Sequence, residues 1–330
     1  MSTTTSYMGL TLKNPIIVGA STYTNSAAKI KKLEQHGAAA VVLKSLYEEQ
    51  ILADSGKLVE QDEMYFWYPE AIEVVNGFSK EDGVEEYLNL IKDAKSAVDI
   101  PVIASINCRT PKEWPAFAKK IESAGADGLE LNIYISPADI DAGRSVEETY
   151  LAIVKEVRAN TKLPLAVKIG YYFSDVARFV TQLSSTGVEG LVLFNRYFRP
   201  DIDIEALRLA NDNIFSAPQE ITLSLRWIAL LADKVECDLA GATGVHDYAG
   251  VVKEVLAGAK AVQVVSALYK SGPQAIEKMV SGLETWMQKH NYDSVDAFRG
   301  MVAKGPENTA AFERVQFMRR TTGQYQEAPR

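Results

Sequence analysis

Cysteine is scarce in this sequence, which has two cysteines, Cys108 and Cys237, among its 330 residues. Two cysteines are too few for a disulfide framework, and they fit a reducing, cytoplasmic environment. They are also too few for the four thiolates that hold an iron–sulfur cluster. The sequence therefore does not indicate which electron acceptor a redox reaction here would use.

Long apolar runs and excess positive charge are also missing. No apolar run approaches the ~20 residues of a membrane-spanning helix. The first residues, MSTTTSYMGL, lack the basic and then apolar pattern of a signal peptide. The formal net charge of −8 argues against nucleic acid or an anionic membrane as a partner. We therefore expect a cytoplasmic protein whose ligand is a small molecule.

What the sequence does contain is a recurring short apolar run that ends in Gly, Ser, Asn or Lys. Unbroken apolar runs are typical of parallel strands that are covered on both faces. The runs lie at 15–21, 39–45, 101–107, 128–134, 164–170, 190–195, 237–243 and 261–268.

Amphipathic helical patterns separate these runs. Phrases such as EQHGAAAVVL and ESAGADGLEL read as helix, glycine and strand in turn. A βα unit that recurs eight times predicts a (β/α)8 TIM barrel in one domain over residues 1–330. An open doubly wound sheet is the alternative, which we favour less because no GxGxxG motif opens the first helix. The clearest helical patterns lie at 26–37, 110–125, 247–259 and 273–290.

Three further stretches exceed what a minimal barrel needs. Insertions after strands 2 and 6, at 46–82 and 196–219, are expected at the carboxyl end of the barrel, where active sites form. The aromatic, acidic part at 62–69 suits either a partner surface or packing against the barrel. A C-terminal helical extension is expected at about 303–330, packed either on the barrel or on a partner.

Polar side chains end many of the predicted strands and would face a ligand at the barrel mouth. Lys44 and Lys168 are the most informative, because an ammonium group next to apolar strand residues needs an anionic or hydrogen-bonding partner. Ser and Asn at such positions can also cap loops. The others are Ser21, Ser45, Asn107, Asn132, Asn195 and Ser266.

Two turns after strands seven and eight are typical of a phosphate cradle. GATG at 241–244 lets the backbone approach an anion closely, and SALYKSGP at 266–273 begins a short helix. Together with the two lysines, these turns predict a phosphorylated ligand, and flavin mononucleotide (FMN) fits that description.

Seven stretches together resemble the dihydroorotate dehydrogenase family nearly end to end. They are LKNPIIVGAS (12–21), VVLKS (41–45), GLELNI (128–133), LPLAVKIG (163–170), GATGV (241–245), AVQVVSALYKSGP (261–273) and NYDSVDAFRGM (291–301). The resemblance implies a TIM barrel, bound FMN, oxidoreductase activity in pyrimidine biosynthesis and a homodimer.

The resemblance also implies roles for individual residues. Lys44 is a candidate catalytic lysine, Ser136 is the candidate base with Tyr134 second, and Asn76 and Asn195 are candidates for substrate binding. The candidates for binding FMN are Ala20, Ser21, Lys44, Ser45, Asn107, Asn132, Lys168, Gly241, Gly244, Val265 and Ser266.

The sequence departs from the family pattern mainly at the substrate site. Asn76 is out of register in its loop, one extra residue precedes Ser136, and Ala138 replaces an asparagine of the family motif. Arg196 stands where the family has a small residue. Each unmade buried hydrogen bond costs about 1–3 kcal/mol, so we expect poor binding of orotate.

Three hypotheses of function follow. The first is an FMN-dependent oxidoreductase that acts on CH–CH donors other than dihydroorotate, or acts poorly on dihydroorotate. The second is an FMN-binding protein without dehydrogenase activity that serves as a redox or structural partner. The third, less favoured, is a barrel aldolase that uses Lys168 or Lys44 as a Schiff base.

Overall fold

The computed structural model describes most of the chain, in six ranges. Residues 48–82 of the predicted 46–82 insertion, which include Asn76, lie outside the described residues, as do Ser136 and almost all of the C-terminal extension. Predictions about them, including the one-domain prediction for 1–330, stay predictions. The described ranges are 1–47, 83–108, 114–135, 145–197, 200–210 and 214–303.

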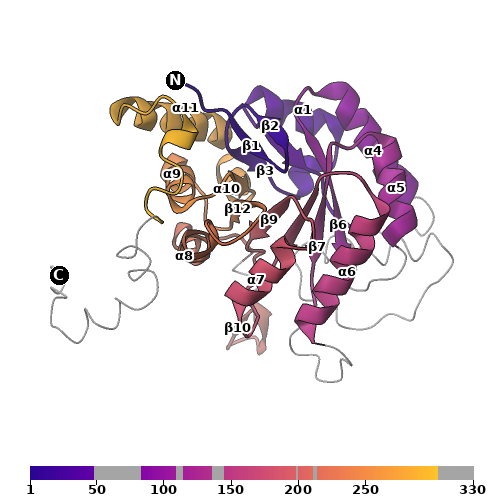
Figure 1. Ribbon diagram of the computed structural model, residues 1–330. Coiled ribbons are helices and arrows are strands. Elements are labelled where there is room, and N and C mark those ends of the chain that lie inside the picture. The colour runs from indigo at the N-terminus through magenta and orange to yellow at the C-terminus, as the bar shows by residue number, and fades with distance from the viewer. Residues whose placement is uncertain (48–82, 109–113, 136–144, 198–199, 211–213, 304–330) are drawn as a thin grey trace.

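Within these ranges, parallel strands form a closed ring of eight (Figure 1). The last strand of the ring pairs with the first at Val262 and Ile16, and β4 pairs with β6 to complete the circle. This closure confirms the TIM barrel and excludes the open doubly wound sheet. The strands are β3 (Ile16–Val18), β4 (Ala40–Val42), β6 (Val102–Cys108), β7 (Gly128–Ile133), β8 (Leu165–Ile169), β9 (Gly190–Leu193), β12 (Asp238–Ala242) and β13 (Ala261–Val264). A short strand, β5 (Leu46–Tyr47), pairs with the end of β6.

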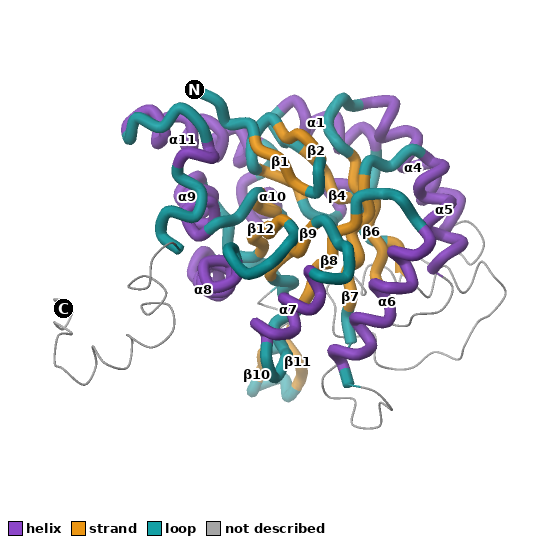
Figure 2. Tube along the Cα trace, viewed as in Figure 1, coloured by secondary structure: helices purple, strands orange, loops and turns teal. Residues whose placement is uncertain are grey.

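Helices surround the ring and alternate with its strands (Figure 2). All four helical patterns are confirmed over the residues that are described. The run at 261–268 was predicted too long, because the chain turns into helix α10 at Ser266. Strand and helix compete in such short apolar runs, since periodicity alone does not separate them. The helices are α1 (Ala27–Gln35), α4 (Gly83–Ala97), α5 (Trp114–Ala124), α6 (Val146–Asn160), α7 (Val176–Ser184), α8 (Ile221–Leu231), α9 (Tyr248–Ala257), α10 (Ser266–Ser271) and α11 (Gln274–Lys289).

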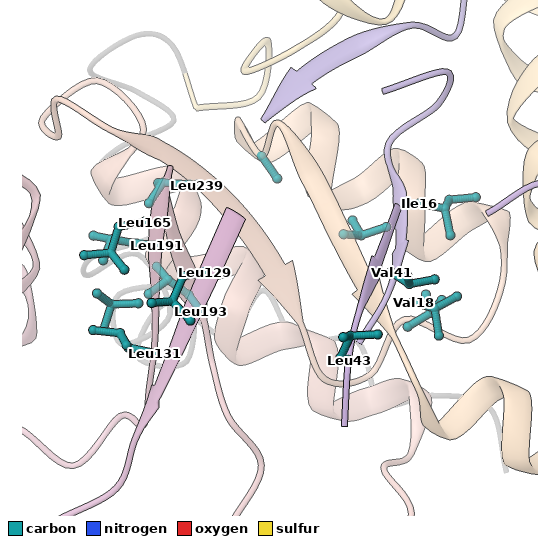
Figure 3. Packing of buried hydrophobic residues seen from close by; sticks show 14 of the residues in the cluster. Ile16, Val18, Val41, Leu43, Leu129, Leu131, Leu165, Leu191, Leu193 and Leu239 are labelled. Carbon is teal, nitrogen blue, oxygen red and sulfur yellow. The ribbon is translucent and has the colours of Figure 1, made fainter. Parts of the chain in front are cut away.

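Alternate side chains of the barrel strands face two separate cores, and only β7 among the eight contributes no apolar residue to the second one. One core lies between the strands and the helices, and Figure 3 shows part of it, with leucines of β7, β8, β9 and β12 on one side and Ile16, Val18 and Val41 on the other. The second core fills the barrel interior with small residues, including Ala166, Val192 and Ala240. Period-two alternation explains why the unbroken apolar runs satisfy both cores.

An N-terminal hairpin closes the barrel at the end where its strands begin. Strands β1 (Thr5–Tyr7) and β2 (Leu10–Leu12) place Tyr7 and Met8 in the interior core. The backbone N–H of Met8 donates to Asp238, the first residue of β12, across 3.0 Å. A β-carbon at Gly190 would lie 2.8 Å from the Tyr7 hydroxyl, so this position needs glycine. A ligand must therefore enter from the opposite, carboxyl end.

The insertion after the sixth barrel strand contains a second hairpin. Strands β10 (Asp201–Asp203) and β11 (Arg208–Ala210) pair with each other alone and extend away from the barrel, at the bottom of Figure 1. Short 3-10 turns include η1 (Thr22–Thr24), η3 (Pro218–Glu220) and η4 (Val295–Ala297). Among the described residues, no helix combines the length and apolar character needed to cross a bilayer.

Candidate functional site

A row of buried polar side chains lies at the carboxyl ends of three neighbouring strands. Asn107 on β6 pairs in register with Asn132 on β7, and Asn132 pairs with Lys168 on β8. Residues in register on neighbouring strands point to the same face of the sheet. All three are buried. The predicted strand-end residues thus form one surface that offers amide groups and an ammonium group.

Lys168 is held inside the barrel by a residue from the far side of the ring. Its Nζ donates to Oε1 of Gln263 on β13 across 3.0 Å, and Nε2 of Gln263 donates to the carboxylate of Glu130 on β7. Gln263 and Glu130 are buried as well. This link satisfies the requirement that a buried ammonium have a hydrogen-bonding partner.

Sequence reasoning missed Glu130 and Gln263. Each lies in the middle of an apolar run, GLELNI and AVQVV, and not at its end. The only available signal was a polar residue among apolar ones at an inward-facing position. Burial raises the pKa of the Glu130 carboxyl, while the charge of Lys168 and the bond from Gln263 oppose that rise.

The predicted site residues after the first two barrel strands differ in their burial and in their local contacts. Lys44 follows β4 and is half-buried, and Ser45 shares a 2.9 Å hydrogen bond with the hydroxyl of Ser105. Ala20 is buried at the end of the first strand. The Ser21 hydroxyl donates to the Gly19 carbonyl and accepts from Tyr23 N–H, so it caps the turn that begins η1.

Asn195, which follows β9, contacts the row directly. Its Nδ2 donates to Oδ1 of Asn132 across 2.7 Å. Its backbone N–H donates to Ile169 at the end of β8. Because Asn132 Oδ1 is occupied by this bond, its amide NH₂ is directed elsewhere, and it is the donor that Asn132 can present to a ligand.

The predicted phosphate cradle lies where β12 and β13 end. Gly244 has a φ of +83°, and a β-carbon there would lie 2.2 Å from the Ile221 backbone nitrogen, so the turn requires glycine. Val265 precedes α10, and Ser266 is its first residue. Gly241 lies within β12, where a side chain would collide with Glu254, so close packing explains this glycine.

Three further polar residues surround this cradle and were not predicted as site residues. Ser216 donates from its backbone N–H to Ser266 Oγ across 3.0 Å, and its own Oγ lies 3.0 Å from Nε2 of His246. Lys270 donates to the Ser216 carbonyl across 2.6 Å. Burial and, to a lesser extent, the charge of Lys270 lower the pKa of His246 from its ordinary value, which favours the neutral ring. Ser216 and His246 come from two separate loops and Lys270 from helix α10, and no sequence motif joins the three.

A cavity of about 470 Å³ opens beside Asn195, between the ends of β8, β9 and β12 and the start of α8. Its walls include the rings of Tyr171, Phe194 and Tyr197. Arg196 and Glu220 form an ion pair in its lining, with 3.0 Å between Nε and Oε2. The departure from the family pattern at Arg196 therefore contributes an ion pair to the wall of this cavity.

Of the two candidate bases, only Tyr134 is described. It is half-buried, and its ring centre lies 5.3 Å from that of Tyr197. Among the described residues, no group of His, Cys, Asp or Glu could hold a metal ion.

These donors fit FMN. Lysine and amide groups at the strand ends suit the polar edge of a flavin ring, and backbone N–H groups at Gly244, Val265 and Ser266 suit a phosphate. Helix α10 has only six residues, so its dipole is small and the cradle depends on the N–H groups of the loop backbone.

Comparison with known proteins gives consistent matches. The family model described as dihydroorotate dehydrogenase matches residues 2–287. The chain is 27% identical over 310 residues to the dihydroorotate dehydrogenase B (NAD(+)) catalytic subunit of Methanothermobacter thermautotrophicus, covering 90% of this chain and 97% of the relative. It is 27% identical over 313 residues to the protein of the same name from Pyrococcus furiosus, covering 92% of this chain and 100% of the relative. A putative dihydroorotate dehydrogenase A (fumarate) of Aeropyrum pernix is 27% identical over 241 residues, 71% of this chain and 78% of the relative.

Proposed function

Because the chain belongs to the dihydroorotate dehydrogenase family, we propose that it is an FMN-dependent oxidoreductase that acts on a CH–CH donor. The observation that carries this proposal is the row of Asn107, Asn132 and Lys168 at the barrel mouth, with the Gly244 turn at the same end. Family membership supports an oxidoreductase, whereas FMN and the substrate are parts of the proposal.

We assign the groups that would hold FMN to strand ends. The ring would contact Ala20, Lys44, Asn132 and Lys168, with Ser21, Ser45 and Asn107 beside them. The phosphate would receive backbone N–H groups at Gly244, Val265 and Ser266, with Gly241 supporting the turn. Ser216, whose N–H donates to Ser266 Oγ, and Lys270, which donates to the Ser216 carbonyl, would help to hold the anion.

The residues of the chain have three tasks in this reaction. When bound, FMN would supply the hydride-accepting chemistry. Lys168, fixed by Gln263, would stabilise negative charge at the ring. Asn132, oriented by Asn195, donates a hydrogen bond to the ligand. The proton that leaves the substrate passes to Ser136 or Tyr134, and serine needs activation by a neighbour because its hydroxyl is a poor base.

We propose that the substrate is a CH–CH donor other than dihydroorotate, or that dihydroorotate is used only poorly. The sequence departs from the family pattern around Asn76 and Ser136, and Arg196 and Glu220 form an ion pair beside Asn195. A planar molecule that packs on Tyr171 and Tyr197 would suit the cavity there. Hydrogen bonding to Asn195 would fix its orientation.

Purification and reduction test the proposal. The protein should bind FMN, and anaerobic addition of some member of a panel of dihydropyrimidines and related CH–CH compounds should bleach the flavin absorbance. Dihydroorotate should be a poor member of that panel. If FMN binds and no donor reduces it, the second hypothesis applies, a flavoprotein that serves as a redox or structural partner.

A Schiff-base aldolase is less well supported than either. Lys168 Nζ already donates to Gln263 Oε1, and a lysine acts as a nucleophile only when it is neutral. Borohydride trapping with carbonyl compounds should give no adduct on Lys168 or Lys44.

We also propose a homodimer in the cytoplasm, and the second hairpin supports an interface. Ile204 and Leu207 are 75% and 86% exposed, and Ile202 and Leu209 are exposed beside them. A two-stranded hairpin is marginally stable alone, and exposed apolar patches mark contact sites. Leu207→Asp should reduce the mass measured by light scattering to that of a monomer. Val302→Asp, also at an exposed apolar position, should not.

A further inference from the structure

The hydrogen bond from Lys168 to Gln263, called the polar link below, crosses the barrel interior between distant strands. Lys168 is on β8 and Gln263 is on β13, with β9 and β12 between them in the ring. The intervening strands present Val192, Ala240 and Ala242 to the interior. These small side chains leave room for the long Lys168 and Gln263 side chains to meet, so the link depends on the choice of residues on four strands.

The direction of the Gln263 amide is fixed by its two partners. Lys168 has only donors, so the amide oxygen must face it. The amide nitrogen must then face Glu130, to which it donates. If the amide were reversed, its NH₂ group would face the Lys168 ammonium, a second donor, and its oxygen would face the Glu130 carboxylate, a second acceptor. Glu130 thus holds Gln263 in the one orientation that can accept from Lys168.

Stability alone does not explain this arrangement. Lys168, Glu130 and Gln263 are each at most 9% exposed, and one Glu130 carboxylate oxygen, Oε1, has no hydrogen-bond partner among the described residues. Replacing buried charged groups by apolar residues of similar size is often neutral or stabilising. A barrel filled by apolar side chains would avoid these costs, which points to a role for the position of Lys168.

We propose that Gln263 is a positioning residue that holds the Lys168 ammonium at the barrel mouth, and that Glu130 acts through Gln263 by fixing its amide. This inference rests on the proposed function, since the group that Lys168 would serve is the flavin. Without the link, Lys168 is free to adopt other rotamers, and its charge stabilises the reduced flavin less.

The redox midpoint potential of bound FMN tests this role without measuring turnover. Lys168→Met should shift the potential to more negative values, because a positive charge near the reduced flavin is lost. Gln263→Met should shift it in the same direction by a smaller amount. In the Lys168→Met background, Gln263→Met should cause no further shift. Thr161→Val, which alters a buried polar residue far from the mouth, should leave the potential unchanged.

Two outcomes would overturn the proposal. One is a potential that Gln263→Met does not move. The other is an equal shift from Gln263→Met whether or not Lys168 is present, because an effect on the flavin that bypasses Lys168 is not positioning.

A measurement without flavin separates this proposal from the proposed function. In the free protein, the losses in unfolding free energy from Lys168→Met and Gln263→Met should not add in the double variant, since both remove the same bond. Glu130→Gln keeps an oxygen that accepts from Gln263 and should retain this coupling, whereas Glu130→Leu should abolish it. Additive losses would overturn the positioning role. Failure of the wild-type protein to bind FMN would instead overturn the proposed function.

Discussion

Asn195 and Asn132 are joined by a 2.7 Å hydrogen bond from Nδ2 to Oδ1, which connects the end of β9 to the end of β7. The bond passes over β8, the strand that carries Lys168. It gives Asn132 a fixed amide orientation before any ligand arrives, and preorganised donors lower the cost of binding.

Replacing Asn195 by alanine should release that orientation. We expect Asn195→Ala to weaken FMN binding by up to about tenfold, since one hydrogen bond contributes on the order of 1 kcal/mol. Titration of the protein against FMN, followed by flavin fluorescence, gives the affinity. Asn160→Ala is the control, because the side chain of this residue at the end of α6 donates to Glu156 in its own helix. Equal affinities for wild type and Asn195→Ala would show that Asn195 does not organise the site.

Gly244 and Gly9 form a matched pair for testing the cradle. Both have positive φ, +83° and +74°, but a β-carbon at Gly244 would collide with Ile221 whereas one at Gly9 would meet nothing within 4 Å. Gly9→Ala should cost about 1–2 kcal/mol of stability from backbone strain alone. Gly244→Ala should cost more and also weaken FMN binding. Chemical denaturation and FMN titration measure the two effects, and equal losses for the two variants would contradict the clash.

Glu254 should make stability depend on pH. Burial raises the pKa of this carboxyl from 4.5 to about 8. The native state therefore holds the proton more tightly than the unfolded state. This stabilising contribution is complete below about pH 4.5 and falls as the pH rises towards 8, by at most about 1.4 kcal/mol per pH unit.

The neighbouring serine supports a protonated Glu254. Ser224 Oγ lies 2.9 Å from the Ile221 carbonyl and 2.5 Å from Glu254 Oε1, yet a hydroxyl has one proton to donate. A protonated carboxyl can donate to Ser224 while Ser224 donates to Ile221. Glu254→Gln should flatten the pH dependence of the unfolding free energy between pH 5 and 8. A wild-type profile that is already flat would contradict the raised pKa.

The ion pair beside the cavity predicts an asymmetric pair of variants. Arg196 and Glu220 have side chains that are only 15% and 14% exposed. Arg196→Ala removes the positive charge beside a poorly solvated carboxylate, which keeps its hydrogen bond from the Ala217 N–H, and should destabilise the protein by about 3 kcal/mol. The double variant Arg196→Met with Glu220→Met should lose less stability than Arg196→Met alone or Glu220→Met alone. Thermal unfolding of the three variants measures this, and additive losses would show that the two residues are not coupled.

Much of the fold could be predicted from the sequence because each barrel strand is an apolar run followed by a helix. The strand-end residues Asn107, Asn132 and Lys168 were predicted for the same reason. Glu130 and Gln263 were missed because their significance depends on a contact across the ring, and strand order does not reveal which inward side chains meet. Ser216 and His246 were missed because loops that are 30 residues apart in the sequence bring them together. For Ser21 the sequence left two roles open, facing a ligand or capping a loop, and in the structure its hydroxyl caps the adjacent turn.

The central claim is that the barrel mouth binds FMN. Its most direct test is a titration of the purified protein with FMN, followed by absorbance and by retention of yellow colour after gel filtration, with Gly244→Ala and Gly9→Ala measured in parallel. We predict one FMN per chain for the wild type and Gly9→Ala, and weakened binding for Gly244→Ala. A folded wild-type protein that stays colourless after incubation with excess FMN would contradict the claim.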